Sequence, residues 1–96
     1  IFGVGFSCDG YDITVPEPTG KWAALAIERA TSKSFIPDYI NAHGTGTLLN
    51  DAAESKALRS SFDTSRCLVS STKGATGHCL GAAGLIEAII AMLALK

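Results

Sequence analysis

The segment Leu80–Leu95 constrains the fold more than any other part of this sequence. Its 16 residues carry one charged side chain, Glu87, and apolar residues lie on nearly every side of the predicted helix. A helix that is apolar all round belongs in the interior of a large protein or in a membrane. Since a membrane span needs about 20 apolar residues, we expect a helix over Cys79–Leu95 that is buried in a larger α/β core.

Composition supports the same interpretation. Hydrophobic residues make up 47% of the 96 residues and charged residues 18%, against roughly 25% charged residues in a typical soluble domain. The apolar content excludes a disordered tail. The formal net charge is −1 and no cluster of Lys and Arg is present, so we expect no nucleic-acid-binding surface.

The cysteines indicate the redox compartment of the protein, and the two ends indicate how much of a protein this chain represents. Cys8, Cys67 and Cys79 are an odd set with no close pair, which argues against a secreted disulfide scaffold and for a reducing compartment. We interpret Cys8 and Cys79 as core residues. The chain starts without Met and stops directly after an apolar run, so we expect a piece of a longer protein without a signal peptide.

Strand and helix patterns alternate along the chain and predict an α/β fold with a mostly parallel, mixed sheet. Asn50 or Asp51 is expected to cap the second helix, with Glu54 in a capping-box-like position. Residues 43–47 are expected to form a turn, and residues 71–78 a loop rich in glycine. The β-α-β-α-β-α order consists of predicted strands at 1–6, 35–42 and 67–70 and helices at 22–31, 51–62 and 79–95, with Ala53, Ala57 and Leu58 of the second helix inward.

Both histidines lie in glycine-rich loops that follow predicted strands. His43 follows the strand ending at Ala42, and His78 precedes the apolar helix. Ligands of open α/β sheets bind beyond the carboxyl ends of the strands, where both loops are expected. The helix macrodipole disfavours an imidazolium at His78, and a neutral imidazole can donate a hydrogen bond to a carbonyl oxygen that is becoming negative. Two histidines in equivalent places favour ligand binding over a purely structural role.

Five other side chains are candidates for the same site. Lys73 either adds positive potential there or is a solvated surface lysine. Glu87 must be paired or protonated inside an apolar helix; Lys73 is its nearest partner in chain order, and Glu54 is a second candidate for pairing with that lysine. Thr45 and Thr47 flank Gly46 and either offer hydroxyls to a ligand or complete a turn.

Several common site patterns are absent. The sequence contains neither a phosphate-binding G-x-x-x-x-G-K-[ST] loop nor G-x-G-x-x-G, which argues against a nucleotide-binding module. It also lacks CxxC and HExxH, and its histidines and cysteines do not have metal-site spacing, so we expect no zinc.

Two long motifs resemble the histidine signatures of β-ketoacyl-acyl carrier protein synthases. Residues 41–47, Asn-Ala-His-Gly-Thr-Gly-Thr, followed by Asp51 and Glu54, look like the first signature. Residues 70–84, Ser-Ser-Thr-Lys-Gly-Ala-Thr-Gly-His-Cys-Leu-Gly-Ala-Ala-Gly, with Glu87, are similar to the second. The likeness extends over essentially all of the chain and is greatest to the discrete bacterial enzymes of fatty-acid elongation.

The resemblance implies a thiolase-like fold of two similar α/β halves, usually dimeric, of which residues 1–96 would be the C-terminal half, truncated at both ends. It implies a cytoplasmic acyltransferase without a cofactor or a membrane span. Its substrates would be carried on the phosphopantetheine of acyl carrier protein. The reaction would be decarboxylative condensation of malonyl-carrier protein with an acyl-enzyme thioester.

The resemblance also implies residue roles. His43 and His78 would hold the malonyl thioester oxygen and stabilise the enolate, and Lys73, paired with Glu87 or Glu54, would support both histidines. Thr45 and Thr47 would contact the pantetheine arm. The family's nucleophilic cysteine lies in the N-terminal half, and none of the three cysteines here matches it, so the chain alone is expected to be inactive. A polyketide ketosynthase, its cysteine-less chain-length partner and a non-catalytic interaction domain of the same fold stay open as alternatives.

Overall fold

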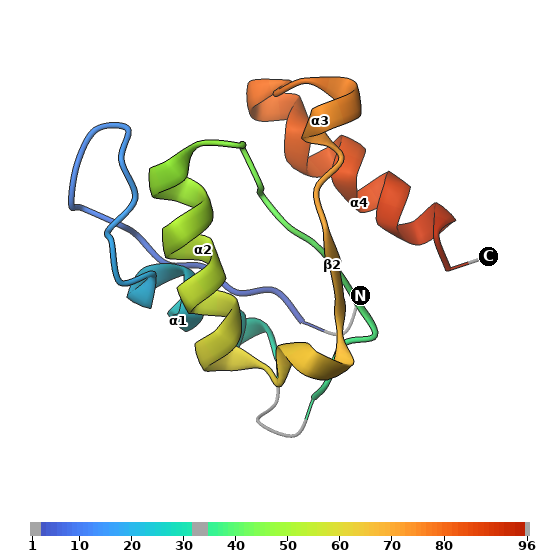
Figure 1. The fold of residues 1–96 in the computed structure, drawn as a ribbon, viewed down its shortest axis with the longest axis horizontal. Coiled ribbons are helices and arrows are strands. Elements are labelled where there is room, and N and C mark those ends of the chain that lie inside the picture. Colours follow the sequence, from blue (N-terminus) through green and yellow to red (C-terminus); the bar gives the residue numbers. More distant parts are fainter. Residues whose placement is uncertain (1–2, 32–34, 96) are drawn as a thin grey trace.

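The computed structural model describes residues 3–31 and 35–95, and Figure 1 shows how their elements are arranged. Helices α1 (Lys21–Ala30) and α2 (Leu48–Ser61) pack together on one side of a short pair of strands. Helices α3 (Lys73–Thr76) and α4 (Ala83–Leu93) lie on the other side, and α4 contacts the first strand. The mixed α/β class predicted from the sequence is therefore present.

Helix α2 carries most of the small core. Its buried residues are Ala53, Ala57 and Leu58, the three predicted to face inward. Two of them are alanines, which allow α1 to lie close against α2. The apolar positions of α1 are only half-buried; they are Trp22, Ala26, Ile27 and Ala30.

Strands β1 (Tyr39–Asn41) and β2 (Leu68–Ser70) are parallel, as the alternating order predicts, with Tyr39 opposite Leu68 and Asn41 opposite Ser70. The ladder continues at each end, because Leu68 N donates to Asp38 O over 3.0 Å and Ala42 N donates to Ser70 O over 2.8 Å. Strand β1 is shorter than the predicted 35–42, since Pro37 has no N–H to donate to a ladder.

The prediction of a strand at residues 1–6 is wrong for residues 3–6; residues 1–2 lie outside the described residues. This segment runs against α1, with its glycines facing helix carbonyls. A side-chain carbon at Gly3 would lie 1.9 Å from Ala30 O, and one at Gly5 would lie 1.8 Å from Ala26 O. A backbone that lies this close to a helix has no strand to pair with on that side.

The predicted helix over residues 79–95 is divided in two. A 3-10 turn, η2 (Leu80–Ala82), precedes α4, and Leu80 has a positive φ of 47° that a continuous α-helix does not contain. The predicted loop over residues 71–78 contains the single-turn helix α3. A second 3-10 turn, η1 (Thr64–Arg66), leads into β2.

The expected burial of the C-terminal helix is absent from the described residues: α4 is mostly exposed to solvent. Of the residues of α4, only Ala83 is buried, and Leu85 and Met92 are 69% and 60% exposed. The two described strands are too few to cover a helix that is apolar on nearly every side. Within residues 3–31 and 35–95, no helix is long and apolar enough to cross a membrane.

Candidate active site

The two histidines lie together at the carboxyl ends of β1 and β2. His43 follows β1 after one residue, and His78 follows α3 on the chain that leaves β2. The ring centroids are 5.3 Å apart and the ring planes are inclined at 84°, an edge-to-face arrangement. Both side chains are exposed. The parallel strands thus bring the two motifs to one solvent-accessible place, although the residues are 35 positions apart in the sequence (78 − 43).

A hydrogen bond sets the tautomer of His78. The Leu80 N–H donates to Nδ1 of His78 over 3.1 Å, so Nδ1 carries no hydrogen. In the neutral ring the hydrogen then lies on Nε2, where it can be donated to a ligand. The expectation that the α4 macrodipole acts on His78 is wrong, because α4 begins only at Ala83, beyond the 3-10 turn.

His43 is held through its backbone. Its N–H donates to Oε1 of Glu54 over 2.7 Å, and the next N–H, of Gly44, donates to Oε2 over 2.8 Å. On the other side, Lys73 Nζ donates to the carbonyl oxygen of His43. Among the described residues, no hydrogen bond reaches either ring nitrogen of His43, so both are available to a ligand.

Lys73 is buried, which excludes the interpretation as a solvated surface lysine. Its side chain is 4% exposed and forms an ion pair with Oε1 of Glu87, which is 14% exposed. This is the pairing that the sequence predicts for the charge inside the apolar helix. The alternative partner, Glu54, contacts backbone N–H groups instead.

The capping prediction for α2 is wrong. The helix begins at Leu48, so Thr47 is the capping residue, and its side chain makes no capping hydrogen bond. Asp51 and Glu54 lie inside the helix and turn back toward the preceding loop. Asp51 Oδ1 accepts the N–H of Gly46 over 3.3 Å, which leaves Glu54 free to bind the His43 and Gly44 amides.

Thr45 and Thr47 lie in the loop between β1 and α2. Their hydroxyl oxygens are 2.9 Å apart, so one donates to the other. Thr45 is half-buried and Thr47 is exposed. This arrangement leaves at least one hydroxyl lone pair accessible on the same loop as His43.

Ser71 joins the two histidine loops, and nothing in its sequence position indicated this. Its hydroxyl donates to the carbonyl oxygen of Gly44 over 2.9 Å and accepts the N–H of Lys73 over 3.3 Å. Gly44 has a φ of +42°, and a Cβ there would lie 2.4 Å from the Cβ of Ser71. The close approach of the two loops therefore requires glycine at this position.

Gly44→Ala is expected to lower stability markedly. The left-handed backbone costs a non-glycine residue about 1–2 kcal/mol, and the collision with Ser71 adds about 1–3 kcal/mol of overpacking. Thermal unfolding followed by circular dichroism measures the change, with Gly74→Ala as the control because a Cβ at Gly74 meets nothing within 4 Å. Equal unfolding midpoints for the two variants would contradict the described contact.

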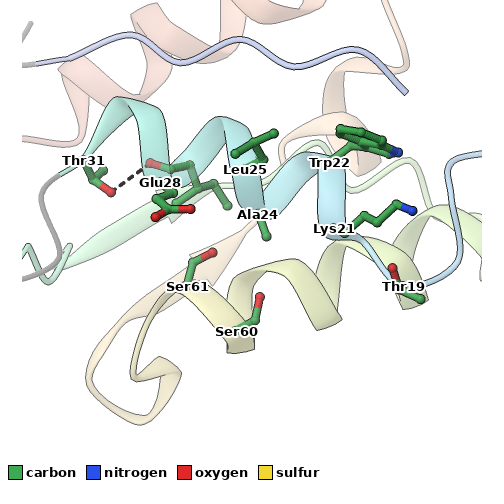
Figure 2. A pocket seen from close by; sticks show the side chains of 10 residues that line it. Thr19, Lys21, Trp22, Ala24, Leu25, Glu28, Thr31, Ser60 and Ser61 are labelled. Carbon is green, nitrogen blue, oxygen red and sulfur yellow. Dashed lines mark hydrogen bonds between the residues drawn. The ribbon is translucent and has the colours of Figure 1, made fainter. Parts of the chain in front are cut away.

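One cavity is lined in part by His43, and another is lined by neither histidine. A cavity of about 260 Å³ reaches His43, Glu54 and Trp22, between α1, α2 and the loop that precedes α1. A cavity of about 850 Å³ lies between α1 and the end of α2 (Figure 2). Ser60 and Ser61 face α1 across it, and Lys21 and Glu28 are its charged residues. Neither histidine lines it, so it is separate from the candidate site.

Cys67 is not an activated nucleophile. Burial raises the pKa of the Cys67 thiol, and the neighbouring carboxylate of Asp38 raises it further. The interpretation of Cys8 as a core residue is wrong, because its side chain is exposed, while Cys79 is half-buried. Within the part of the chain that the structure describes, no three His, Cys, Asp or Glu side chains are grouped to hold a metal ion.

Comparison with known proteins identifies what this chain resembles. All of residues 1–96 match the family described as "Beta-ketoacyl synthase, C-terminal domain". The chain is 48% identical to the mitochondrial 3-oxoacyl-[acyl-carrier-protein] synthase of Arabidopsis thaliana, with 97% of the chain and 22% of that protein covered. It is 43% identical to 3-oxoacyl-[acyl-carrier-protein] synthase 2 of Vibrio cholerae and 42% identical to that of Staphylococcus aureus, covering 25% of each. The chain therefore spans about a quarter of the length of these relatives.

Proposed function

This chain belongs to the β-ketoacyl synthase family as its C-terminal domain, and we propose that it supplies the decarboxylation half of an active site for 3-oxoacyl-thioester synthesis in fatty-acid elongation. The observation that carries the proposal is the His43–His78 pair, two exposed rings 5.3 Å apart with Nε2 of His78 free to donate. The relatives named as 3-oxoacyl-[acyl-carrier-protein] synthases support this choice of reaction.

The chemistry needs two hydrogen-bond donors at one oxygen. When malonyl thioester loses CO2, the carbon–carbon bond to the carboxylate breaks and its electron pair moves toward the thioester carbonyl, which becomes an enolate. His43 and His78 donate to that oxygen as it becomes negative, which stabilises charge that develops in the transition state. The enolate carbon then attacks the acyl thioester of a cysteine, forms the new carbon–carbon bond and expels the cysteine thiolate.

Lys73 acts on this site through His43. Its ammonium donates to the His43 carbonyl oxygen, while the Glu87 carboxylate balances its charge inside the protein. Lys73 therefore places one positive charge next to the histidine pair and holds the loop that carries His43. A charge of this sign favours both the malonyl carboxylate and the enolate.

The remaining assignments concern substrate delivery. Thr45 and Thr47 contact the pantetheine arm in our proposal, because their hydroxyls lie on the His43 loop. The partner is acyl carrier protein, whose phosphopantetheine carries the substrates, and the complete protein is a cytoplasmic homodimer that needs no further cofactor. Its nucleophilic cysteine comes from outside residues 1–96.

The test compares the complete protein that contains this domain with the 96-residue chain. Acyl- and malonyl-carrier protein are supplied to each, and CO2 release and 3-oxoacyl product are measured by mass spectrometry. The complete protein is expected to form both. The isolated chain is expected to form no 3-oxoacyl product above a His43→Ala/His78→Ala control. Turnover by the isolated chain, or no CO2 release by the complete protein, would overturn the proposal.

A further inference from the structure

The cavity of about 850 Å³ between α1 and the end of α2 has a lining that favours one kind of ligand (Figure 2). Its volume is within the range of sites for small organic molecules, about 300–1,000 Å³. Trp22, Leu25 and Ile27 supply the apolar part of its wall. Neither His43 nor His78 lines it, so an occupant contacts neither ring of the candidate active site.

Three hydroxyl groups of this cavity present hydrogen-bond acceptors to a ligand. Ser60 and Ser61 both donate to the carbonyl oxygen of Ala57, over 2.8 and 2.9 Å. Thr31 donates to the carbonyl oxygen of Ile27 over 2.8 Å. Since a hydroxyl has one hydrogen and two lone pairs, each of the three has used its hydrogen within the protein and keeps lone pairs for a donor in the cavity.

Negative potential is concentrated at the same end of the cavity. Helix α1 ends at Ala30 and α2 ends at Ser61, and the C-terminal end of a helix is equivalent to about −0.5 elementary charge. The carboxylate of Glu28, in the last turn of α1, adds a full negative charge there (Figure 2). The basic residues of the two last turns, Arg29 and Arg59, do not line the cavity. This end therefore favours a cation that donates hydrogen bonds.

The positive charge that lines the cavity lies at its other end. Lys21 is the first residue of α1, and the two turns that separate it from Glu28 span about 10 Å along the helix axis. Its ammonium lies 5.2 Å from the centroid of the Trp22 ring, whose face attracts a cation. Lys21 therefore does not compete with a ligand for the Glu28 carboxylate.

We propose that this cavity binds an aliphatic amine in its protonated form, at a site separate from the histidine pair. The ammonium donates to the Glu28 carboxylate and to the hydroxyl oxygens of Ser60 and Ser61. The alkyl chain lies along the apolar wall that Leu25 and Trp22 provide. An alcohol of the same length lacks the charge, and a carboxylate of the same length brings a negative charge to an end that offers acceptors. The cavity therefore selects by charge among ligands with one alkyl chain.

Binding is measured on the complete protein by ligand-observed NMR titration with hexylamine, 1-hexanol and hexanoate at pH 7, where an alkyl ammonium like that of lysine is protonated. Hexylamine is expected to bind saturably, and the other two are expected to bind about 3- to 5-fold more weakly, the effect of an exposed ion pair. Absence of saturable hexylamine binding would overturn the proposal, and so would hexanol or hexanoate that binds as tightly as hexylamine.

Substitutions in the complete protein locate the bound ammonium. Glu28→Gln is expected to weaken hexylamine binding by about 3- to 5-fold and to leave 1-hexanol binding unchanged. Asp38→Asn is its control, because Asp38 is an exposed carboxylate outside the cavity. Ser60→Ala/Ser61→Ala is also expected to weaken hexylamine binding, and Ser55→Ala is the control on the same helix, since Ser55 lines a different cavity. Equal hexylamine affinities for Glu28→Gln and Asp38→Asn would contradict the assigned site.

Discussion

His43→Ala and His78→Ala are each expected to slow malonyl decarboxylation by the complete protein by about 10²–10³-fold, the usual cost of removing one donor to a developing oxyanion. Each substitution removes one of the two rings that face each other at 5.3 Å. The double variant is expected to lose little more than the more damaging single variant, since both rings act on one oxygen. Release of CO2 from malonyl-carrier protein measures the effect.

Acyl transfer to the nucleophilic cysteine provides the internal control for the histidine variants. That step does not form the malonyl enolate, so it is expected to fall far less than decarboxylation. Gly74→Ala, which changes the same loop region without a contact to either ring, is the matched variant. An equal loss of both steps in His43→Ala and His78→Ala would show that the histidines maintain structure rather than stabilise the enolate.

Lys73→Met is expected to lower the stability of the domain by about 3–5 kcal/mol, because it leaves the Glu87 carboxylate in a low-dielectric site without its partner. The side chains of the pair are 4% and 14% exposed, so water cannot replace the ammonium fully. The substitution also removes the Lys73 hydrogen bond to the His43 carbonyl oxygen, and decarboxylation is expected to fall with stability. Chemical denaturation and CO2 release measure the two effects.

A second substitution separates these two effects of Lys73. Lys73→Met/Glu87→Leu removes both charges, and such replacements of a buried pair are often neutral or stabilising. Stability is expected to return toward that of the unchanged protein, while decarboxylation stays low because the Lys73 ammonium no longer holds the His43 carbonyl oxygen. Recovery of both properties in the double variant would mean that Lys73 serves only to pair with Glu87.

Features carried by periodicity and by residue type were predictable from the sequence. The spacing of Ala53, Ala57 and Leu58 predicted the inward face of α2, and these three are its buried residues. The cost of an unpaired charge in an apolar helix predicted the Lys73–Glu87 pair. The order of strands and helices predicted the parallel pairing of β1 with β2. Each of these follows from burial or from chain order alone.

Contacts that depend on loop conformation were not predictable in the same way. The spacing of Glu54 from Asp51 predicts a capping box, yet Glu54 binds amides of the loop that precedes α2. Ser71 lies within the second motif without any signal of its own, and its role depends on the left-handed backbone of Gly44. Such hydrogen bonds involve backbone atoms. Because every residue type has these atoms, the sequence gives no signal for the bonds.

The segments predicted least well are those whose conformation or burial depends on the other segments packed against them. Residues 3–6 have the composition of a strand, but they pack on α1 and have no strand partner. Helix α4 has the composition of a core helix, but most of it is exposed in this chain. The relatives are about four times longer than this chain. A sequence pattern indicates that a helix is buried, but it does not indicate which segment covers the helix.

The most direct test is the structure of the complete protein bound to a malonyl-thioester analogue that cannot lose CO2. The oxygen that corresponds to the thioester carbonyl is predicted to lie between the two rings, within hydrogen-bond distance of Nε2 of His78 and of one ring nitrogen of His43. The pantetheine arm is predicted to pass along the loop of Thr45 and Thr47. An analogue bound with that oxygen in contact with neither ring would contradict the assignment of His43 and His78 as its paired donors.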